Sequence, residues 1–230
     1  MERWVTFDCY GTLVNWKAGL AEIVRPLAGE RTPALVDALA YLEPPVAARQ
    51  PHLSYRQVLS ETLLLAAAQE LIPVPGGQEN LLADNWDRLP IFPDVPEALA
   101  GLRSAGWRLA VLTNCDDDLF AHSARILGEP LDEVVTAEQV RSYKPQLAHF
   151  REFARRTGTG PENWVHVGNS WMADMVAAAR LGLPRVWIDR DRSGHDPSLA
   201  TIALPDVKDL VQAVGNAAVM GSAHGIDPLR

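Results

Sequence analysis

The stretch Trp4-Val5-Thr6-Phe7-Asp8-Cys9-Tyr10-Gly11-Thr12-Leu13 decides the fold. Four residues of aromatic and β-branched character lead into an acid, and Gly11 signals a tight bend shortly after it. A short apolar run that is bounded by a turn signal is typical of a buried strand. Ligands of open α/β sheets bind outside the carboxyl ends of the parallel strands, so Asp8 would lie at that edge on a rigid support. A lone Asp in this position more often begins a turn, and later stretches must decide between the two interpretations.

From Ile91 onward, helical and strand patterns alternate along the chain. We predict strands at 107–113, 133–136, 164–167, 185–188 and 200–203. We predict helices at 96–105, 117–127, 146–157, 171–181 and 206–214. Strands that alternate with helices of this length indicate βαβ units and a parallel sheet. The predicted fold class is therefore α/β, with a Rossmann-like parallel sheet as its core.

Residues 15–90 have a different character, because only helical spacing occurs there. Three amphipathic groups begin near Leu20, Leu35 and Val58, and Pro44-Pro45 and 73–77 punctuate them. An all-helical block that follows a single strand is typical of an inserted cap. We expect a core of 1–14 and 91–215, a helical cap of 15–90, and a partly disordered tail of 216–230.

The composition excludes several classes of protein. The chain has 230 residues and a net charge of -8, which argues against a nucleic-acid partner. Its two cysteines, Cys9 and Cys115, lack the spacing of a metal site and fit a reducing compartment. No run reaches the length of a membrane span, and the first residues lack the pattern of a signal peptide. We therefore expect a cytoplasmic protein without a membrane or nucleic-acid partner.

Polar side chains follow the predicted strands at several points. Lys144 precedes Pro145 between two of these strands, and Asp174 lies one helical turn after the last polar group. Each residue alone has an ordinary explanation as a turn, a helix N-cap or a surface lysine. Their order at successive strand ends instead favours one site, in which a carboxylate beside an ammonium stays ionised as a nucleophile. The converging set is Asp8, Thr113, Asn114, Lys144, Asn169, Ser170 and Asp174.

These motifs resemble those of the haloacid dehalogenase-like hydrolase superfamily. The four motifs are Asp8-Cys9-Tyr10-Gly11-Thr12, Thr113-Asn114, Lys144-Pro145, and Gly168-Asn169-Ser170 through Asp174. The resemblance covers the whole predicted core, and it accommodates the helical insert as the family's mobile cap. It implies a hydrolase in which Asp8 is the nucleophile.

Two positions bear on the branch of the superfamily. Tyr10 stands where the family's phosphatases carry a second Asp, which protonates the departing alkoxide. A halide is a weak base and needs no such acid. The phosphatases also bind Mg²⁺ through carboxylates, usually with an Asp where this chain has Asn169. We therefore expect no metal and no cofactor. A Mg²⁺-dependent small-metabolite phosphatase is the alternative, and a catalytically silent binding protein is a third hypothesis.

Asp-x-Tyr-Gly-Thr and Tyr-Lys-Pro together resemble the L-2-haloacid dehalogenases of the superfamily. The resemblance implies that Asp8 forms an ester with the carbon bearing the leaving group, and that water then cleaves this ester. The substrate would be a small 2-substituted carboxylic acid that loses a halide or a strained-ring nitrogen. A homodimer is implied by the resemblance only. We assign catalytic roles to Asp8, Thr12, Lys144, Asn169 and Asp174. We assign substrate contacts to Cys9, Tyr10, Thr113, Asn114, His149, Ser170 and Trp171.

The cap departs from that branch in one respect. Those dehalogenases grip the halogen and the substrate with an Arg in the first cap helices, but residues 34–48 contain none and the next is Arg49. His149-Phe150 also stands where the family places a Tyr shortly after the motif lysine. The departure points to a substrate other than an ordinary chloro- or bromo-acid. Candidate pocket walls are Trp16, Trp86, Trp171 and His149.

Overall fold

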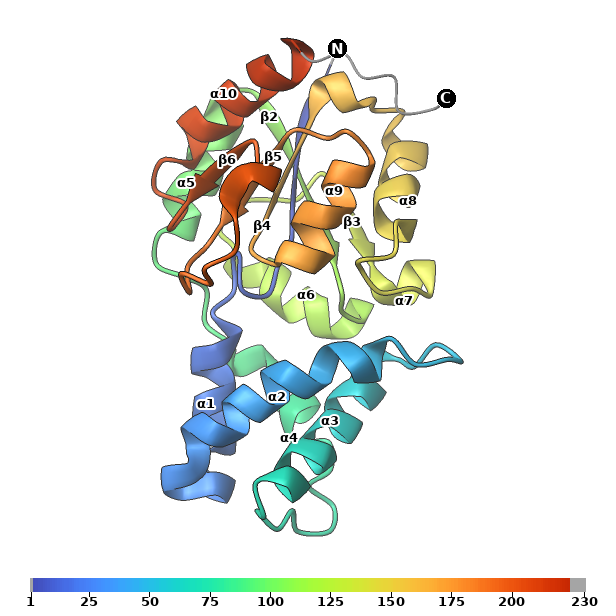
Figure 1. The fold of residues 1–230 in the computed structure, drawn as a ribbon, viewed down its shortest axis with the longest axis vertical. Coiled ribbons are helices and arrows are strands. Elements are labelled where there is room, and N and C mark those ends of the chain that lie inside the picture. The colour runs from blue at the N-terminus through green and yellow to red at the C-terminus, as the bar shows by residue number, and fades with distance from the viewer. Residues whose placement is uncertain (1, 224–230) are drawn as a thin grey trace.

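The computed structural model describes residues 2–223 and contains a sheet of six parallel strands in the order β3-β2-β1-β4-β5-β6. The strands are β1 (Arg3–Phe7), β2 (Trp107–Thr113), β3 (Glu133–Thr136), β4 (Trp164–Gly168), β5 (Arg185–Ile188) and β6 (Ile202–Leu204). The predicted α/β class with a Rossmann-like parallel sheet is therefore confirmed. Figure 1 shows this sheet with helices on both faces and further helices gathered at one end.

Strand β1 lies in the middle of the sheet because its side chains are apolar toward both faces. Val5 and Phe7 pack into one hydrophobic cluster, and Trp4 packs into the other. The chain continues to β2 and β3 on one side of β1, and to β4, β5 and β6 on the other. Ligands of open α/β sheets bind where the strand order reverses in this way. The topology therefore directs attention to the carboxyl end of β1.

The core helices form two layers around the sheet. Buried side chains of α5 (Val95–Ser104), α6 (Asp117–Ile126) and α10 (Leu210–Ala223) belong to the cluster of Val5. Those of α8 (Ala148–Thr157) and α9 (Ala177–Arg180) belong to the cluster of Trp4. Short elements complete the core: α7 (Ala137–Val140), the 3₁₀ turns Pro161–Asn163 and Pro197–Leu199, and the π-helical turn η4 (Trp171–Val176).

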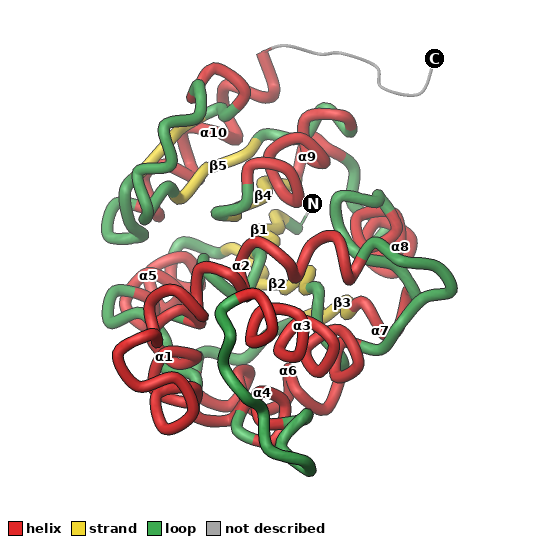
Figure 2. The backbone as a smooth tube through the Cα atoms, turned by 60° about the horizontal axis from the view of Figure 1, so that its bottom comes forward, coloured by secondary structure: helices red, strands yellow, loops and turns green. Residues whose placement is uncertain are grey.

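Four helices and two 3₁₀ turns lie between β1 and α5. They are α1 (Trp16–Ala28), α2 (Thr32–Ala47), α3 (Tyr55–Gln69), α4 (Leu81–Asp84), Gly29–Arg31 and Trp86–Arg88. All of them fall within the predicted range 15–90. The four helices lie together at one end of the molecule in Figure 1, and Figure 2 turns that end toward the viewer. The chain enters these helices after Val14 and leaves them before Ile91, and an antiparallel bridge joins these two residues.

Several local predictions are wrong. Helix α2 continues through Pro44 and Pro45, which lie in its last turn, and it ends two residues later at Ala47. Helix α10 runs to Ala223, so residues 216–223 are helical and not a disordered tail. Its buried face contains the small residue Ala217, which gives little apolar signal in the sequence. Residues 224–230 of the predicted tail lie outside the described residues. Among residues 2–223, no helix combines the length and apolar character that crossing a membrane requires.

Candidate active site

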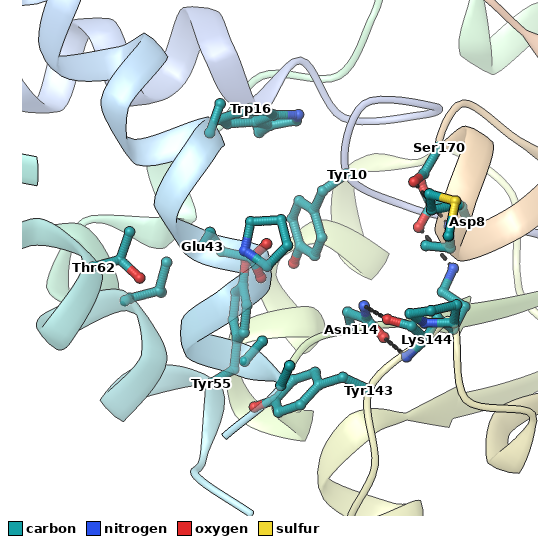
Figure 3. A pocket seen from close by; sticks show the side chains of 18 of the residues that line it. Asp8, Tyr10, Trp16, Glu43, Tyr55, Thr62, Asn114, Tyr143, Lys144 and Ser170 are labelled. Carbon is teal, nitrogen blue, oxygen red and sulfur yellow. Dashed lines mark hydrogen bonds and ion pairs between the residues drawn. The ribbon is translucent and has the colours of Figure 1, made fainter. Parts of the chain in front are cut away.

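A cavity of about 690 Å³ lies between the carboxyl ends of the strands and the inserted helices (Figure 3). This volume is within the roughly 300–1,000 Å³ of small-molecule sites. Its core side includes Asp8, Asn114, Lys144, Asn169, Ser170 and Trp171. Its cap side includes Trp16, Glu43, Tyr55, Thr62 and Trp86. The cavity thus brings together side chains that are far apart in the sequence.

Asp8 follows β1 directly, and both of its carboxylate oxygens accept hydrogen bonds. Lys144 Nζ lies 3.0 Å from Oδ1, and the Thr12 hydroxyl donates to Oδ2 at 2.9 Å. The same hydroxyl accepts a hydrogen bond from the Asn169 backbone N–H at 2.9 Å, so its proton must point toward Asp8. Asp8 is therefore held in one orientation by groups from three different segments.

Lys144 is buried between two carboxylates. Its Nζ lies 2.7 Å from Asp174 Oδ1 and 3.0 Å from Asp8 Oδ1. The backbone of Lys144 is held by Asn114, whose side-chain oxygen accepts from the Lys144 N–H at 2.7 Å and whose amide donates to the Lys144 carbonyl at 3.1 Å. The predicted neighbours of Asp8 thus fix both ends of the lysine.

A buried hydrogen-bond chain that the sequence analysis did not identify supports Asp174. The Trp164 indole donates to Thr6 Oγ1 at 2.7 Å, so the Thr6 hydroxyl donates to His166 Nδ1 at 2.9 Å. His166 Nε2–H is then left to face Asp174 Oδ1 at 3.3 Å. Polar side chains within an apolar buried strand were the available signal, because such groups are almost always hydrogen-bonded.

The charges of this cluster follow from its burial. Burial raises the pKa of Asp8 to about 6, and the Lys144 ammonium limits the rise. Burial also opposes ionisation of Asp174, but Lys144 and the hydrogen bond from His166 hold the pKa of Asp174 at about 2. Despite its own burial, Lys144 has a raised pKa because of these two carboxylates. At neutral pH the cluster is an ionised carboxylate pair around one ammonium.

The phenol of Tyr10 points away from Asp8 and is fixed in the cavity wall. Its oxygen accepts from Trp86 Nε1 at 2.8 Å and lies 3.1 Å from Ser123 Oγ. The ring packs edge-on against Trp86 at 5.0 Å, and Trp86 packs in the same way against Tyr55 at 5.6 Å. Burial raises the pKa of Tyr10 well above its usual value, so its proton is strongly held.

Three predicted substrate contacts are corrected by the structure. The side chains of Cys9, Thr113 and His149 are fully buried and do not line the cavity, so they would not touch a molecule bound there. His149 Nε2 lies 3.1 Å from the Thr113 carbonyl oxygen, and burial lowers the pKa of His149 to about 3. The other predicted contacts, Tyr10, Asn114, Ser170 and Trp171, do line the cavity. Thr12 and Asp174 stand behind it and hold the residues that face it.

The cap contributes an acid that the sequence analysis did not assign to the site. Glu43 of α2 lines the cavity, and burial together with the charge of Asp8 raises its pKa to about 7. Arg49, the first arginine after this stretch, instead pairs with Glu61 at 2.5 Å and lies outside the cavity lining. No motif marks Glu43, so only the packing of α2 reveals its position.

Contacts from the core hold the start of α3 and the loop before it. The Asp116 carboxylate accepts the backbone N–H groups of Tyr55 and Arg56 at 2.8 and 3.0 Å. The Tyr143 hydroxyl donates to the Leu53 carbonyl at 2.8 Å. An acid at a helix N-terminus is expected to be stabilising. Asp116 has this role for α3, although α3 begins about sixty residues before Asp116 in the chain. These bonds fix the wall that carries Tyr55.

Comparison with known proteins shows the family to which the chain belongs. The model of the haloacid dehalogenase-like hydrolase family matches residues 2–182. An (S)-2-haloacid dehalogenase of Burkholderia cepacia is 27% identical over 211 residues, or 85% of each chain. A glyceraldehyde 3-phosphate phosphatase of Methanothermobacter thermautotrophicus is 33% identical over 102 residues, which cover 44% of this chain and 45% of the relative. The structure of L-2-haloacid dehalogenase from Xanthobacter autotrophicus superposes with a TM-score of 0.81 at 19% identity, covering 94% of this chain and 99% of that one.

The chain therefore belongs to the haloacid dehalogenase-like hydrolase family. It is a hydrolase, and its long matches place it beside the 2-haloacid dehalogenases of that family.

Proposed function

We propose that this hydrolase displaces a leaving group from a small 2-substituted carboxylic acid, with Asp8 as the nucleophile and without a metal ion. The observation that carries the proposal is the Asp8 carboxylate, held at the cavity by Thr12 and Lys144 at 2.9 and 3.0 Å. A fixed, ionised carboxylate at the wall of a small-molecule cavity is suited to attack a carbon centre. The similarity over 85% of the chain to a relative named (S)-2-haloacid dehalogenase supports this substrate class.

The proposed reaction has two steps. An Asp8 oxygen forms a bond to the carbon that bears the leaving group, and the halide departs with the bonding electrons. Water then adds to the Asp8 carbonyl carbon, the ester breaks, and the hydroxy acid leaves with the original Asp8 oxygen while a proton passes to solvent. Lys144 has one N–H left after its bonds to Asp8 and Asp174, and this donor would bind the substrate carboxylate.

The residues around Asp8 fit a metal ion poorly. Asp8 and Asp174 each direct an oxygen at the Lys144 ammonium, and their other oxygens are also hydrogen-bonded. Mg²⁺ requires several hard oxygen ligands in an octahedral array. The neutral amide of Asn169 adds no negative charge where the family's phosphatases have a carboxylate. Within residues 2–223, no three His, Cys, Asp or Glu side chains are grouped so that they could hold a metal. The fixed phenol of Tyr10 is also unsuited to protonate an alkoxide, which weighs against the phosphatase alternative.

Three substrates assayed with and without EDTA test the proposal: 2-chloropropionate, fluoroacetate and p-nitrophenyl phosphate. We expect halide release that EDTA does not change and that Asp8→Asn abolishes. Phosphate release that EDTA abolishes would support the phosphatase instead. No turnover of a wide panel of 2-substituted acids, with ligand binding intact in Asp8→Asn, would support a silent binding protein.

A further inference from the structure

The cavity has few groups that attract an anion. Lys144 is the only Lys or Arg side chain that lines it in the described part of the chain. Its ammonium is already shared by Asp8 and Asp174, and Glu43 adds a third acid nearby. A substrate with no positive charge would therefore leave the negative charges of this cavity unbalanced.

Glu43 lacks a partner among the residues that the structure describes. Its carboxylate forms no hydrogen bond or ion pair with any residue of 2–223, although it is half-buried. Figure 3 shows it on the cap side, across the cavity from Asp8 and Lys144. Carboxylates that are withdrawn from water are normally paired. The raised pKa of Glu43, caused by burial and by the charge of Asp8, reflects the same missing partner.

Thr62 of α3 provides an independent observation. Its side chain is 1% exposed and lines the cavity, and its hydroxyl has no hydrogen-bond partner in residues 2–223. Two unpaired polar groups of the cap thus face one cavity, and both accept hydrogen bonds. A ligand group that is rich in N–H donors would satisfy them together.

Aromatic rings line the same cavity as these two groups. Tyr10, Trp16, Tyr55 and Trp86 all line the cavity, and the centroids of Tyr55 and Trp86 are 5.6 Å apart. Ring faces attract cations, and aromatic walls with a carboxylate are a recurring arrangement around ammonium groups. Rings, acid and hydroxyl therefore point to the same kind of ligand.

We propose that the substrate carries a protonated amine, which Glu43, Thr62 and the aromatic walls bind while Asp8 attacks a carbon of the same molecule. This inference rests on the proposed hydrolase function. The amine can be separate from a departing halide. It can also be the leaving group of a strained ring: Asp8 forms the C–O bond, the C–N bond breaks, and nitrogen keeps the electron pair as a tethered amine.

Matched substrates test the inference, and they distinguish an amine that is separate from a departing halide from one that belongs to a strained ring. The haloacid pair is 6-amino-2-chlorohexanoate and 2-chlorohexanoate, and azetidine-2-carboxylate tests the ring. We expect wild-type kcat/KM to favour the amino haloacid or the ring. Glu43→Gln should lower kcat/KM for amine substrates by about tenfold or more, as for a partly buried charge pair that loses one charge. The value for 2-chlorohexanoate should fall by much less than the values for the amine substrates, and that difference is the test. Glu30→Gln, an exposed acid outside the cavity, is the control.

Binding without reaction keeps the inference independent of turnover. Calorimetry with unreactive 6-aminohexanoate and hexanoate should show tighter binding of the amine in wild type, lost in Glu43→Gln. Glu43-dependent amine binding with no hydrolysis of any substrate would retain this site but overturn the proposed function. Hydrolysis of 2-chlorohexanoate with no effect of Glu43→Gln on either amine measurement would retain the function and overturn the inference.

Discussion

The two sides of the cavity are built on different principles. On the core side, every carboxylate oxygen of Asp8 and Asp174 has a hydrogen-bond donor. On the cap side, Glu43 and Thr62 have no partner within residues 2–223, and the rest of the wall is mainly aliphatic and aromatic. The difference indicates that the reacting groups are preorganised by the protein, whereas the selecting groups are completed by the ligand.

The largest expected effect separates the two sides directly. Asp8→Asn removes the nucleophile but preserves shape, so kcat should fall by at least about a thousandfold. Binding of 6-aminohexanoate, which we assign to the cap side, should change by no more than about twofold. Turnover assays and calorimetry on the same variant provide both numbers. Residual activity within a factor of about ten would show that Asp8 is not the nucleophile.

The second prediction concerns the stability of the core side. Lys144→Met leaves two buried carboxylates around a lost cation, which should lower the free energy of unfolding by about 3–5 kcal/mol. Lys208→Met is the matched control, because Lys208 is 72% exposed and pairs with Asp206 at 2.9 Å on the surface. Its loss should be much smaller, because an exposed ion pair on the surface contributes little to stability. Urea unfolding measures both, and equal small losses would contradict a tightly coupled cluster.

The pH dependence of the reaction tests the charge of Asp8. Because burial raises the pKa of Asp8 to about 6 and only the carboxylate attacks, kcat/KM should fall as pH drops through that value. This fall of kcat/KM at low pH should persist in Glu43→Gln with 2-chlorohexanoate, since it arises from Asp8 on the core side. A fall near the ordinary carboxyl value of about 4 would contradict the assignment.

A stability control accompanies that profile. Burial lowers the pKa of His149 from 6.5 to about 3, so the unfolded chain binds more protons between these values. The contribution of His149 to stability should therefore decrease as pH falls below 6.5, whereas the raised pKa values of Asp8 and Glu43 contribute in the opposite direction. The difference between wild type and His149→Gln measures the contribution of His149. Melting curves across the same pH range distinguish loss of fold from protonation of Asp8.

Gly11 tests the close approach of the first and last motifs. It has φ of +100°, and a Cβ there would lie 2.4 Å from Asn169 Nδ2. Gly11→Ala should cost about 1–3 kcal/mol of stability and displace Asn169 from the cavity wall. Gly29 has φ of +55° with nothing within 4 Å, so Gly29→Ala should cost only the backbone strain of about 1–2 kcal/mol and leave activity unchanged. Parallel loss of activity in both variants would refute the specific contact.

The smallest effect is expected from the aromatic wall. Trp86→Phe removes the hydrogen bond to Tyr10 and part of the packing against Tyr55. A neutral hydrogen bond contributes about 0.5–1.5 kcal/mol, so KM should rise by about threefold to tenfold. The value of kcat should stay within about twofold, because no reacting group moves. A collapse of kcat with unchanged KM would place Trp86 in the reacting machinery.

Much of the core side was predictable because strand ends fix positions. Asp8 and Lys144 were placed together from their order along parallel strands, and the structure puts them 3.0 Å apart. His166 and Thr6 were missed because their role depends on a buried hydrogen-bond chain, and no motif marks it. His149 was misplaced because its helix turns it toward the Thr113 carbonyl.

The cap side was far less predictable. The spacing of apolar residues identified α1, α2 and α3, but it did not show which side chains enter the cavity. Glu43 is brought there by the way in which α2 packs, and the start of α3 is fixed by an acid sixty residues later in the sequence. Local patterns contain neither helix rotation nor such long-range capping. The substrate-selecting wall therefore emerged only from the structure.

The most direct test of the Asp8 ester is a single turnover in ¹⁸O-water with enzyme in excess over 2-chloropropionate or the preferred substrate. Mass spectrometry of the product and of the peptide that contains Asp8 locates the heavy oxygen. Attack by Asp8 predicts an unlabelled product and one ¹⁸O on Asp8. Label in the product, with Asp8 unchanged, would mean that water attacks the substrate directly and that the carboxylate is not the nucleophile.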